Sequence, residues 1–92
     1  MKKVAQTRLR ITGKVQGVFY RKSAQKRAQE LGLRGYVQNE PDGSVTALVQ
    51  GTPEASEAFY RWCQSGPPGA KVADVRQQTE EGEALEGFEI RF

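Results

Sequence analysis

The sequence predicts an α+β fold in which two helices cover one face of a mainly antiparallel sheet. Alternation of apolar and polar residues predicts strands, and spacings of three and four predict helices. Turn signals separate these segments in the order strand, helix, strand, strand, helix, strand. This order is the ferredoxin-like βαββαβ plan, and a short extra strand follows at the C-terminus. In this plan the first two strands run parallel on either side of the third, so their C-terminal ends share one edge of the sheet.

The first strand and the first helix are predicted from residues 8–31. Between residues 8 and 15, polar residues alternate with apolar residues and glycine, which is the period of a half-buried strand. The helical period then follows, because Ala24, Ala28 and Leu31 are separated by four and three residues. Gly32 is a candidate for the end of this helix.

The next two strands form a predicted hairpin. Residues 33–39 and 44–50 both alternate, and Pro41-Asp42-Gly43 lies between them. Proline presets a negative φ and glycine accepts a positive φ, so this tripeptide is typical of a turn.

The second helix has conventional start signals. Thr52 is a good N-cap, Pro53 suits the first helical position and Glu54 favours the positive end of the helix dipole. Its apolar stripe comprises Ala55, Ala58, Phe59, Trp62 and Cys63. We interpret this stripe as core, although Trp62 could also stack on a ligand and Cys63 could be a reactive thiol.

The C-terminal third is predicted less clearly. Residues 65–69 are rich in glycine and proline and end the second helix. Residues 72–79 read as a fourth strand with a weak pattern. Residues 80–83 are acidic, and we expect them to form a solvated turn. Residues 88–92 alternate again and predict the short last strand.

The start of the first helix is unusual. No Ser, Thr, Asp or Asn lies between Gly13 and Arg21 to cap it, so its first N–H groups lack a side-chain acceptor. Arg21 and Lys22 lie at the positive end of the helix dipole, where cations are disfavoured. A glycine loop, free amides and cations together favour an anion, and phosphate is the obvious candidate. The alternative is an ordinary connection whose Lys and Arg side chains are simply solvated.

Length and composition limit the possible functions. The 92 residues predict a single domain over residues 1–92, with 14 basic and 11 acidic residues and a net charge of +3. The chain contains one cysteine and no histidine, which excludes a Ser-His or Cys-His nucleophile and the usual zinc ligands. We therefore expect no metal and no cofactor. We also expect a monomer in the cytoplasm, with neither a membrane span nor a signal peptide.

Two motifs resemble those of the acylphosphatase family. The first is Gly13-Lys14-Val15-Gln16-Gly17-Val18-Phe19-Tyr20-Arg21. The second is Gly35-Tyr36-Val37-Gln38-Asn39, followed by Gly43-Ser44-Val45 and then Gly51. The resemblance covers essentially the whole chain. One departure is Tyr20, where the family usually has Phe or Met, and its hydroxyl needs a partner if it is buried.

The resemblance implies hydrolysis of an acyl phosphate to a carboxylate and inorganic phosphate. It implies that Arg21 and Asn39 are catalytic and that a backbone loop binds the phosphate. That loop would comprise Val15, Gln16, Gly17, Val18, Phe19, Tyr20 and Arg21. A carboxylate leaves without a general acid, so positioning and electrostatics could suffice without a metal. Inorganic phosphate, as the product, should bind competitively.

Two other functions are compatible with the sequence. Ferredoxin-like domains include RNA binders that stack bases on aromatic residues of the sheet. Tyr36 is the only aromatic residue in the first three strands, so we expect no nucleic-acid partner. The second alternative is an anion-binding domain of the same fold without turnover, because fold alone does not fix function.

Overall fold

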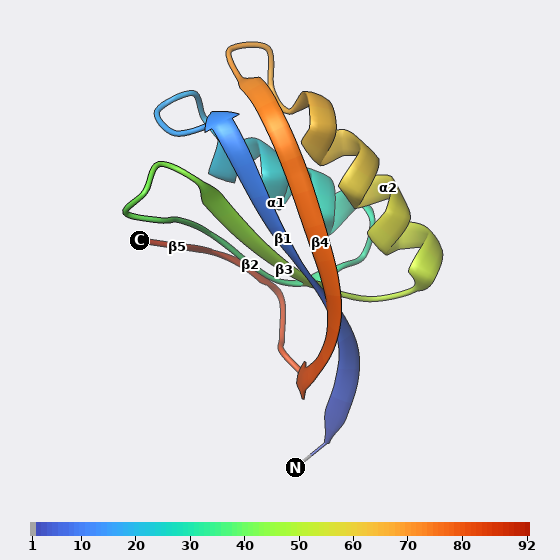
Figure 1. Cartoon of the computed structure of the whole chain (residues 1–92). Coiled ribbons are helices and arrows are strands. Elements are labelled where there is room, and N and C mark those ends of the chain that lie inside the picture. Colours follow the sequence, from blue (N-terminus) through green and yellow to red (C-terminus); the bar gives the residue numbers. More distant parts are fainter. Residues whose placement is uncertain (1) are drawn as a thin grey trace.

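The computed structural model describes residues 2–92 and contains the predicted elements in the predicted order (Figure 1). The elements are β1 (Lys3–Lys14), α1 (Tyr20–Glu30), β2 (Arg34–Asn39), β3 (Val45–Gln50), α2 (Pro53–Ser65), β4 (Lys71–Glu83) and β5 (Phe88–Arg91). Both hairpin strands begin within one residue of their predicted positions. In the described part of the chain, no helix has the length and apolar character needed to cross a membrane.

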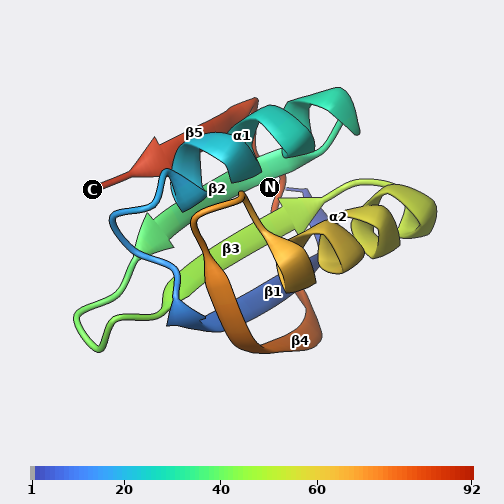
Figure 2. The same ribbon diagram turned by 90° about the horizontal axis from the view of Figure 1, so that it is seen from above.

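The sheet places three strand or loop ends close together. Its order is β4-β1-β3-β2-β5. Strand β3 is antiparallel to both β1 and β2, so β1 and β2 run parallel, as predicted. Strand β5 pairs in parallel with β2 and lies beside α1 (Figure 2). Consequently the loop after β1, the turn after β2 and the end of β5 lie at one end of the sheet, and the N-terminus lies at the other (Figure 1).

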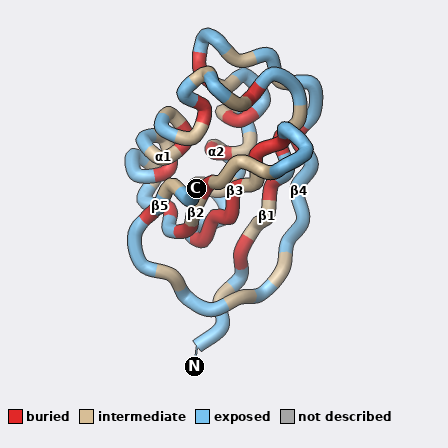
Figure 3. Tube along the Cα trace, turned by 90° about the vertical axis from the view of Figure 1, so that its left-hand side faces the viewer, coloured by how far each residue is buried: buried red, intermediate tan, exposed pale blue. Residues whose placement is uncertain are grey.

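The hydrophobic core lies between the sheet and the two helices, where Figure 3 shows most of the buried chain. Strands β1 and β3 contribute alternate residues to it, among them Leu9, Ile11, Val45, Ala47 and Val49, all fully buried. The largest fully buried side chains of the helices are Tyr20 on α1 and Phe59 on α2.

The helix ends follow their local sequence. Gly32 has a φ of 72°. Its N–H donates to Gln29 O at 3.1 Å, and the N–H of Leu33 donates to Ala28 O at 2.9 Å, which is a Schellman ending. At the start of α2, the N–H of Ala55 donates to Thr52 Oγ1 at 3.1 Å, so the predicted N-cap is confirmed.

The prediction of a solvated acidic turn at residues 80–83 was wrong. These residues continue β4 and pair with the beginning of β1, with Lys3 opposite Glu83. Glu80 accepts hydrogen bonds from Gln6 Nε2 at 2.8 Å and from Arg8 Nη2 at 3.1 Å. A side chain at position 82 would collide with the Gln6 side chain, so only glycine fits there without a shift. Cross-strand partners therefore hold a segment whose own residues favour a loop.

Candidate functional site

The loop between β1 and α1 is held in an unusual backbone conformation. Gly17 has a φ of 74°, and Phe19 has a φ of 61°. Among the described residues, Phe19 is the only one other than glycine with a positive φ. It occupies the N-cap position of α1 without a side-chain hydrogen bond, and the first turn contains no acidic residue. The prediction of an uncapped helix start is therefore confirmed.

Gln16 joins this loop to the hairpin that carries Asn39. Its Nε2 donates to Glu40 O at 2.8 Å and to Ser44 O at 2.9 Å. The two carbonyls lie on either side of the turn between β2 and β3, because the N–H of Glu40 donates to Ser44 O at 2.8 Å. The Gln16 side chain thus fixes the distance between the loop and the end of β2, and only the backbone of Gln16 remains for an anion.

The turn after Asn39 is stiffened by Asp42. The hydroxyl of Ser44 donates to Asp42 Oδ1 at 2.6 Å, and the N–H of Ser44 donates to the same oxygen at 2.9 Å. Arg10 Nη2 donates to Asp42 Oδ2 at 2.9 Å. These hydrogen bonds, first those from Ser44 and then that from Arg10, hold the pKa of Asp42 at about 2. The end of β2 is therefore held in place by a charged turn.

The side chain of Asn39 has an unusual feature. Its Oδ1 is buried and has no hydrogen-bond partner among the residues that the structure describes. A buried amide oxygen without a partner is costly in a folded protein and calls for an explanation. A donor that arrives with a ligand or a water molecule would satisfy it.

Arg21 reaches from the first turn of α1 to the end of β5. Its Nη1 donates to Arg91 O at 2.9 Å, and its Cζ lies 4.8 Å from the centre of the Phe92 ring. A guanidinium carries five N–H donors. Only Nη1 has a hydrogen-bond partner among residues 2–92, so the other donors can meet a ligand.

An open cavity of about 340 Å³ brings these groups together. It is lined by Val15, Gly17, Phe19, Arg21, Lys22, Asn39, Ile90 and Phe92. Five of these belong to the predicted site. Three other predicted residues do not line it: the side chain of Gln16 faces the hairpin, Val18 packs against the core and Tyr20 is buried in it.

Sequence reasoning missed Lys22, Ile90 and Phe92 as lining residues. Lys22 follows Arg21 directly and was noted only as a charge. The clue for the other two was the short alternating segment at the end of the chain. Its parallel pairing with β2, which puts Gln38 opposite Arg91, was not expressed in any local pattern.

Tyr20, the departure from the family pattern, lies in the core at the start of α1 and anchors the helix to α2. Its hydroxyl donates to Cys63 O at 2.7 Å, and its ring lies 5.4 Å from that of Trp62. Burial raises the pKa of Tyr20 above its usual range and raises the pKa of the Cys63 thiol to about 12. The core position of the apolar stripe on α2 is thus confirmed for Cys63, which is fully buried.

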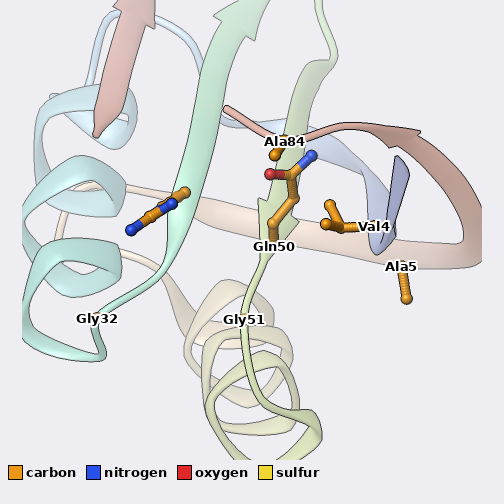
Figure 4. Close-up of a pocket in the computed structure, with 7 residues that line it drawn as sticks. Val4, Ala5, Gly32, Gln50, Gly51 and Ala84 are labelled. Carbon is orange, nitrogen blue, oxygen red and sulfur yellow. The ribbon is translucent and has the colours of Figure 1, made fainter. Parts of the chain in front are cut away.

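A second cavity, of about 350 Å³, lies at the opposite end of the sheet (Figure 4). It is lined by Val4, Ala5, Gly32, Arg34, Gln50, Gly51 and Ala84. The Gln50 amide uses all its polar atoms within the chain. Its Nε2 donates to Gln6 Oε1 and to Glu83 O, both at 2.8 Å, and its Oε1 accepts from the N–H of Leu85 at 2.9 Å. We assign this amide to holding the β4–β5 connection.

The face of the sheet opposite the helices contains Tyr36, the aromatic residue relevant to RNA binding. The guanidinium of Arg91 covers its ring at 3.7 Å, and Arg8 Nη1 donates to its hydroxyl at 3.4 Å. Arg8 also forms an ion pair with Glu80 at 3.1 Å. The ring is therefore already stacked and the nearby cation already neutralised, which disfavours base stacking there.

Comparisons with known proteins agree with this arrangement. A family model described as acylphosphatase matches residues 7–90. An acylphosphatase from Thermococcus kodakarensis is 48% identical over 90 residues, which cover 98% of each chain. An acylphosphatase from Thiobacillus denitrificans is 51% identical over 83 residues, which cover 90% of this chain and 92% of that protein.

A solved structure shows the same fold. The structure of an acylphosphatase from Coxiella burnetii has a TM-score of 0.90 with this chain at 34% sequence identity. The alignment covers 97% of this chain and 93% of that chain. The family model and the relatives span nearly the whole sequence, and the fold is the one predicted from it. This chain therefore belongs to the acylphosphatase family.

Proposed function

We propose that this protein hydrolyses the carboxyl-phosphate bond of acyl phosphates, without a metal ion, at the cavity lined by Arg21 and Asn39. As a member of the acylphosphatase family it is a hydrolase that acts on acid anhydrides. The observation that carries the assignment of the site is the buried, unpaired Oδ1 of Asn39 in the same cavity as Arg21 and the uncapped helix start.

The phosphoryl group would be held by Arg21 and the backbone. The loop from Val15 to Arg21 supplies N–H groups without side-chain acceptors, and the dipole of α1 favours negative charge at its N-terminus. The guanidinium offers parallel N–H donors that match two phosphoryl oxygens, which the point charge of a lysine does not do. These donors also stabilise the charge that develops on the phosphoryl oxygens in the transition state.

The attacking water would be oriented by Asn39. A water that donates one proton to Asn39 Oδ1 has its lone pair free to attack phosphorus in line with the leaving group. The bond from phosphorus to the bridging oxygen breaks, and the carboxylate leaves with that oxygen and its electron pair. A carboxylate is a weak base and needs no general acid. The proton of the water passes to a phosphoryl oxygen of the substrate, so the products are a carboxylate and inorganic phosphate.

The two residues should differ in kinetic signature. Arg21 contacts the phosphoryl group in both the bound substrate and the transition state, so Arg21→Ala should weaken phosphate binding and lower kcat together. Asn39 acts on the water, so Asn39→Ala should lower kcat by at least about 10²-fold. The inhibition constant of inorganic phosphate should stay near its wild-type value in Asn39→Ala. Gln38→Ala, at the neighbouring position of β2, is the matched control, because Gln38 does not line the cavity.

The assay is phosphate release from benzoyl phosphate and acetyl phosphate by protein shown to be folded. Loss of phosphate affinity in Asn39→Ala as severe as that in Arg21→Ala would contradict the assignment of Asn39 to water. Activity abolished by EDTA and restored by Mg²⁺ or Zn²⁺ would contradict metal independence. Phosphate binding without turnover of either compound would instead indicate an anion-binding domain.

A further inference from the structure

The cavity described above has two chemically different sides. Arg21, Lys22 and Asn39 supply its polar side, together with the backbone of the loop. Phe19, Ile90 and Phe92 supply an apolar side. The phosphoryl group and the attacking water account for the polar side only. The apolar side has no assigned role in breaking the bond from phosphorus to the bridging oxygen.

Phe19 and Phe92 are unusual residues on this surface. They are the large hydrophobic side chains that the described part of the chain leaves exposed, Phe19 at 79% and Phe92 completely. Single exposed apolar residues are ordinary. These two come from different segments, the loop before α1 and the residue after β5, and both line one cavity. Their convergence indicates a surface for an apolar ligand group.

The backbone of Phe19 strengthens this interpretation. A left-handed conformation disfavours every residue except glycine, and the strain persists only where the surrounding structure imposes it. Glycine at position 19 would relieve the strain and would remove an exposed ring. A phenylalanine at this position therefore carries a backbone cost, and its exposed ring gains no burial on folding that would offset it.

The rings lie where the acyl part of the proposed substrate must lie. The Phe92 ring is 4.8 Å from the guanidinium carbon of Arg21, and Arg21 also holds Arg91 O at 2.9 Å. Gln25 Nε2 ties the start of β5 to α1 through Phe88 O at 2.9 Å. In an acyl phosphate, one bridging oxygen separates phosphorus from the carbonyl carbon. A phosphoryl group on Arg21 therefore brings the acyl group within reach of Ile90 and the two rings, which line the same cavity.

We propose that Phe19, Ile90 and Phe92 form an acyl-group subsite that selects acyl phosphates with an apolar, aromatic acyl group over small ones. This inference rests on the proposed function and adds the substrate class to it. Stacking of rings contributes favourable energy beyond the apolar area that is buried. One apolar contact in an active site changes kcat/KM by about 10-fold or more, so a preference of that size is expected from each ring.

The test measures kcat/KM for benzoyl phosphate and acetyl phosphate in the wild type, Phe19→Gly and Phe92→Ala. Comparing the benzoyl-to-acetyl ratio between proteins cancels the different intrinsic reactivities of the two compounds. We expect this ratio to fall about 10-fold in each variant. Phe19→Gly should melt at or above the wild-type temperature, because glycine adopts the left-handed conformation freely. Tyr60→Ala, which removes a partly exposed ring of α2 outside the cavity, should keep the wild-type ratio.

The outcomes separate the subsite from the reaction. Turnover of both compounds with the same ratio in all four proteins would overturn the subsite and leave the proposed function standing. A lower ratio accompanied by an equal loss of inhibition by inorganic phosphate would show that the rings act on the phosphate-binding loop from Val15 to Arg21, and this also overturns the subsite. Turnover of neither compound by the wild type would overturn the proposed function and the subsite together.

Discussion

Replacing Tyr20 by phenylalanine removes one hydroxyl from the core. It should destabilise the protein because it leaves the carbonyl of Cys63 without its hydrogen-bond donor. The Tyr20 hydroxyl donates to Cys63 O at 2.7 Å, and both residues are buried. Cys63 lies near the end of α2, where its carbonyl would ordinarily accept from the N–H four residues later. That residue is Pro67, which has no N–H. The hydroxyl therefore supplies a bond that the backbone cannot make.

The size of the effect follows from this geometry. The phenylalanine ring fills the same space, so no large cavity forms. The Cys63 carbonyl keeps its buried position and loses its partner, which costs about 1–3 kcal/mol. For a domain of this size each kcal/mol shifts the melting temperature by about 4–8 °C. We therefore expect Tyr20→Phe to unfold at a clearly lower temperature with the same denaturant m-value.

The measurement is urea unfolding followed by the fluorescence of Trp62. Tyr60→Phe is the matched control, because the Tyr60 hydroxyl accepts from Gln64 Nε2 at 3.3 Å in an exposed position. That variant should stay within about 0.5 kcal/mol of the wild type. A change in Tyr20→Phe as small as the change in Tyr60→Phe would refute the reasoning and would show that the Cys63 carbonyl finds another partner.

Four further predictions concern the hydrogen bonds of Gln16, the Cys63 thiol and the phosphate site. Gln16→Met removes two hydrogen bonds to the hairpin at similar side-chain volume, so it should lower the free energy of unfolding in urea by about 1–3 kcal/mol. It should also lower kcat more than it changes KM. Gln38→Met is the control and should leave kcat unchanged. Cys63 should react with a thiol reagent only as fast as the protein unfolds, which stopped-flow mixing with Ellman's reagent would measure; fast native-state labelling would disprove it. Burial raises the pKa of the Cys63 thiol to about 12, so as the pH rises the unfolded state loses the thiol proton before the folded state does. The free energy of unfolding should therefore fall as the pH rises above about 9. In Cys63→Ala this fall should be shallower. Inorganic phosphate at about 100 times its dissociation constant should stabilise the folded protein by about 2.7 kcal/mol. No rise in melting temperature would mean that the phosphate-binding loop is misassigned.

The elements that local patterns specify were predicted well. Thr52 and Pro53 begin α2, and Gly32 ends α1, because capping and positive φ are properties of a few adjacent residues. The alternation at residues 8–15 predicted a half-buried strand, and in β1 Leu9 and Ile11 are fully buried because one face of the sheet is covered. The parallel arrangement of β1 and β2 then followed from the order of the elements.

Three of the features that sequence reasoning missed depend on distant partners. Residues 80–83 form a strand because β1 extends further toward the N-terminus than its apolar pattern, to Lys3. The contact of the Gln16 side chain with the hairpin depends on two carbonyls that lie 24 and 28 residues away along the chain. The lining role of Ile90 requires the pairing of β5 with β2. None of these contacts can be predicted from the pattern of neighbouring residues in the sequence.

Several costs to stability are concentrated at the end of the sheet that carries the cavity. Phe19 occupies a left-handed conformation, α1 begins without a side-chain cap, and the buried Oδ1 of Asn39 has no partner within residues 2–92. The opposite end contains the Gln50 amide, whose polar atoms are all paired. Because the Gln50 amide is fully paired at one end of the sheet, the unpaired groups at the other end call for a functional explanation. Departures from the local rules persist where a function requires them, and an anion with its attacking water would satisfy the helix start and Asn39 at once.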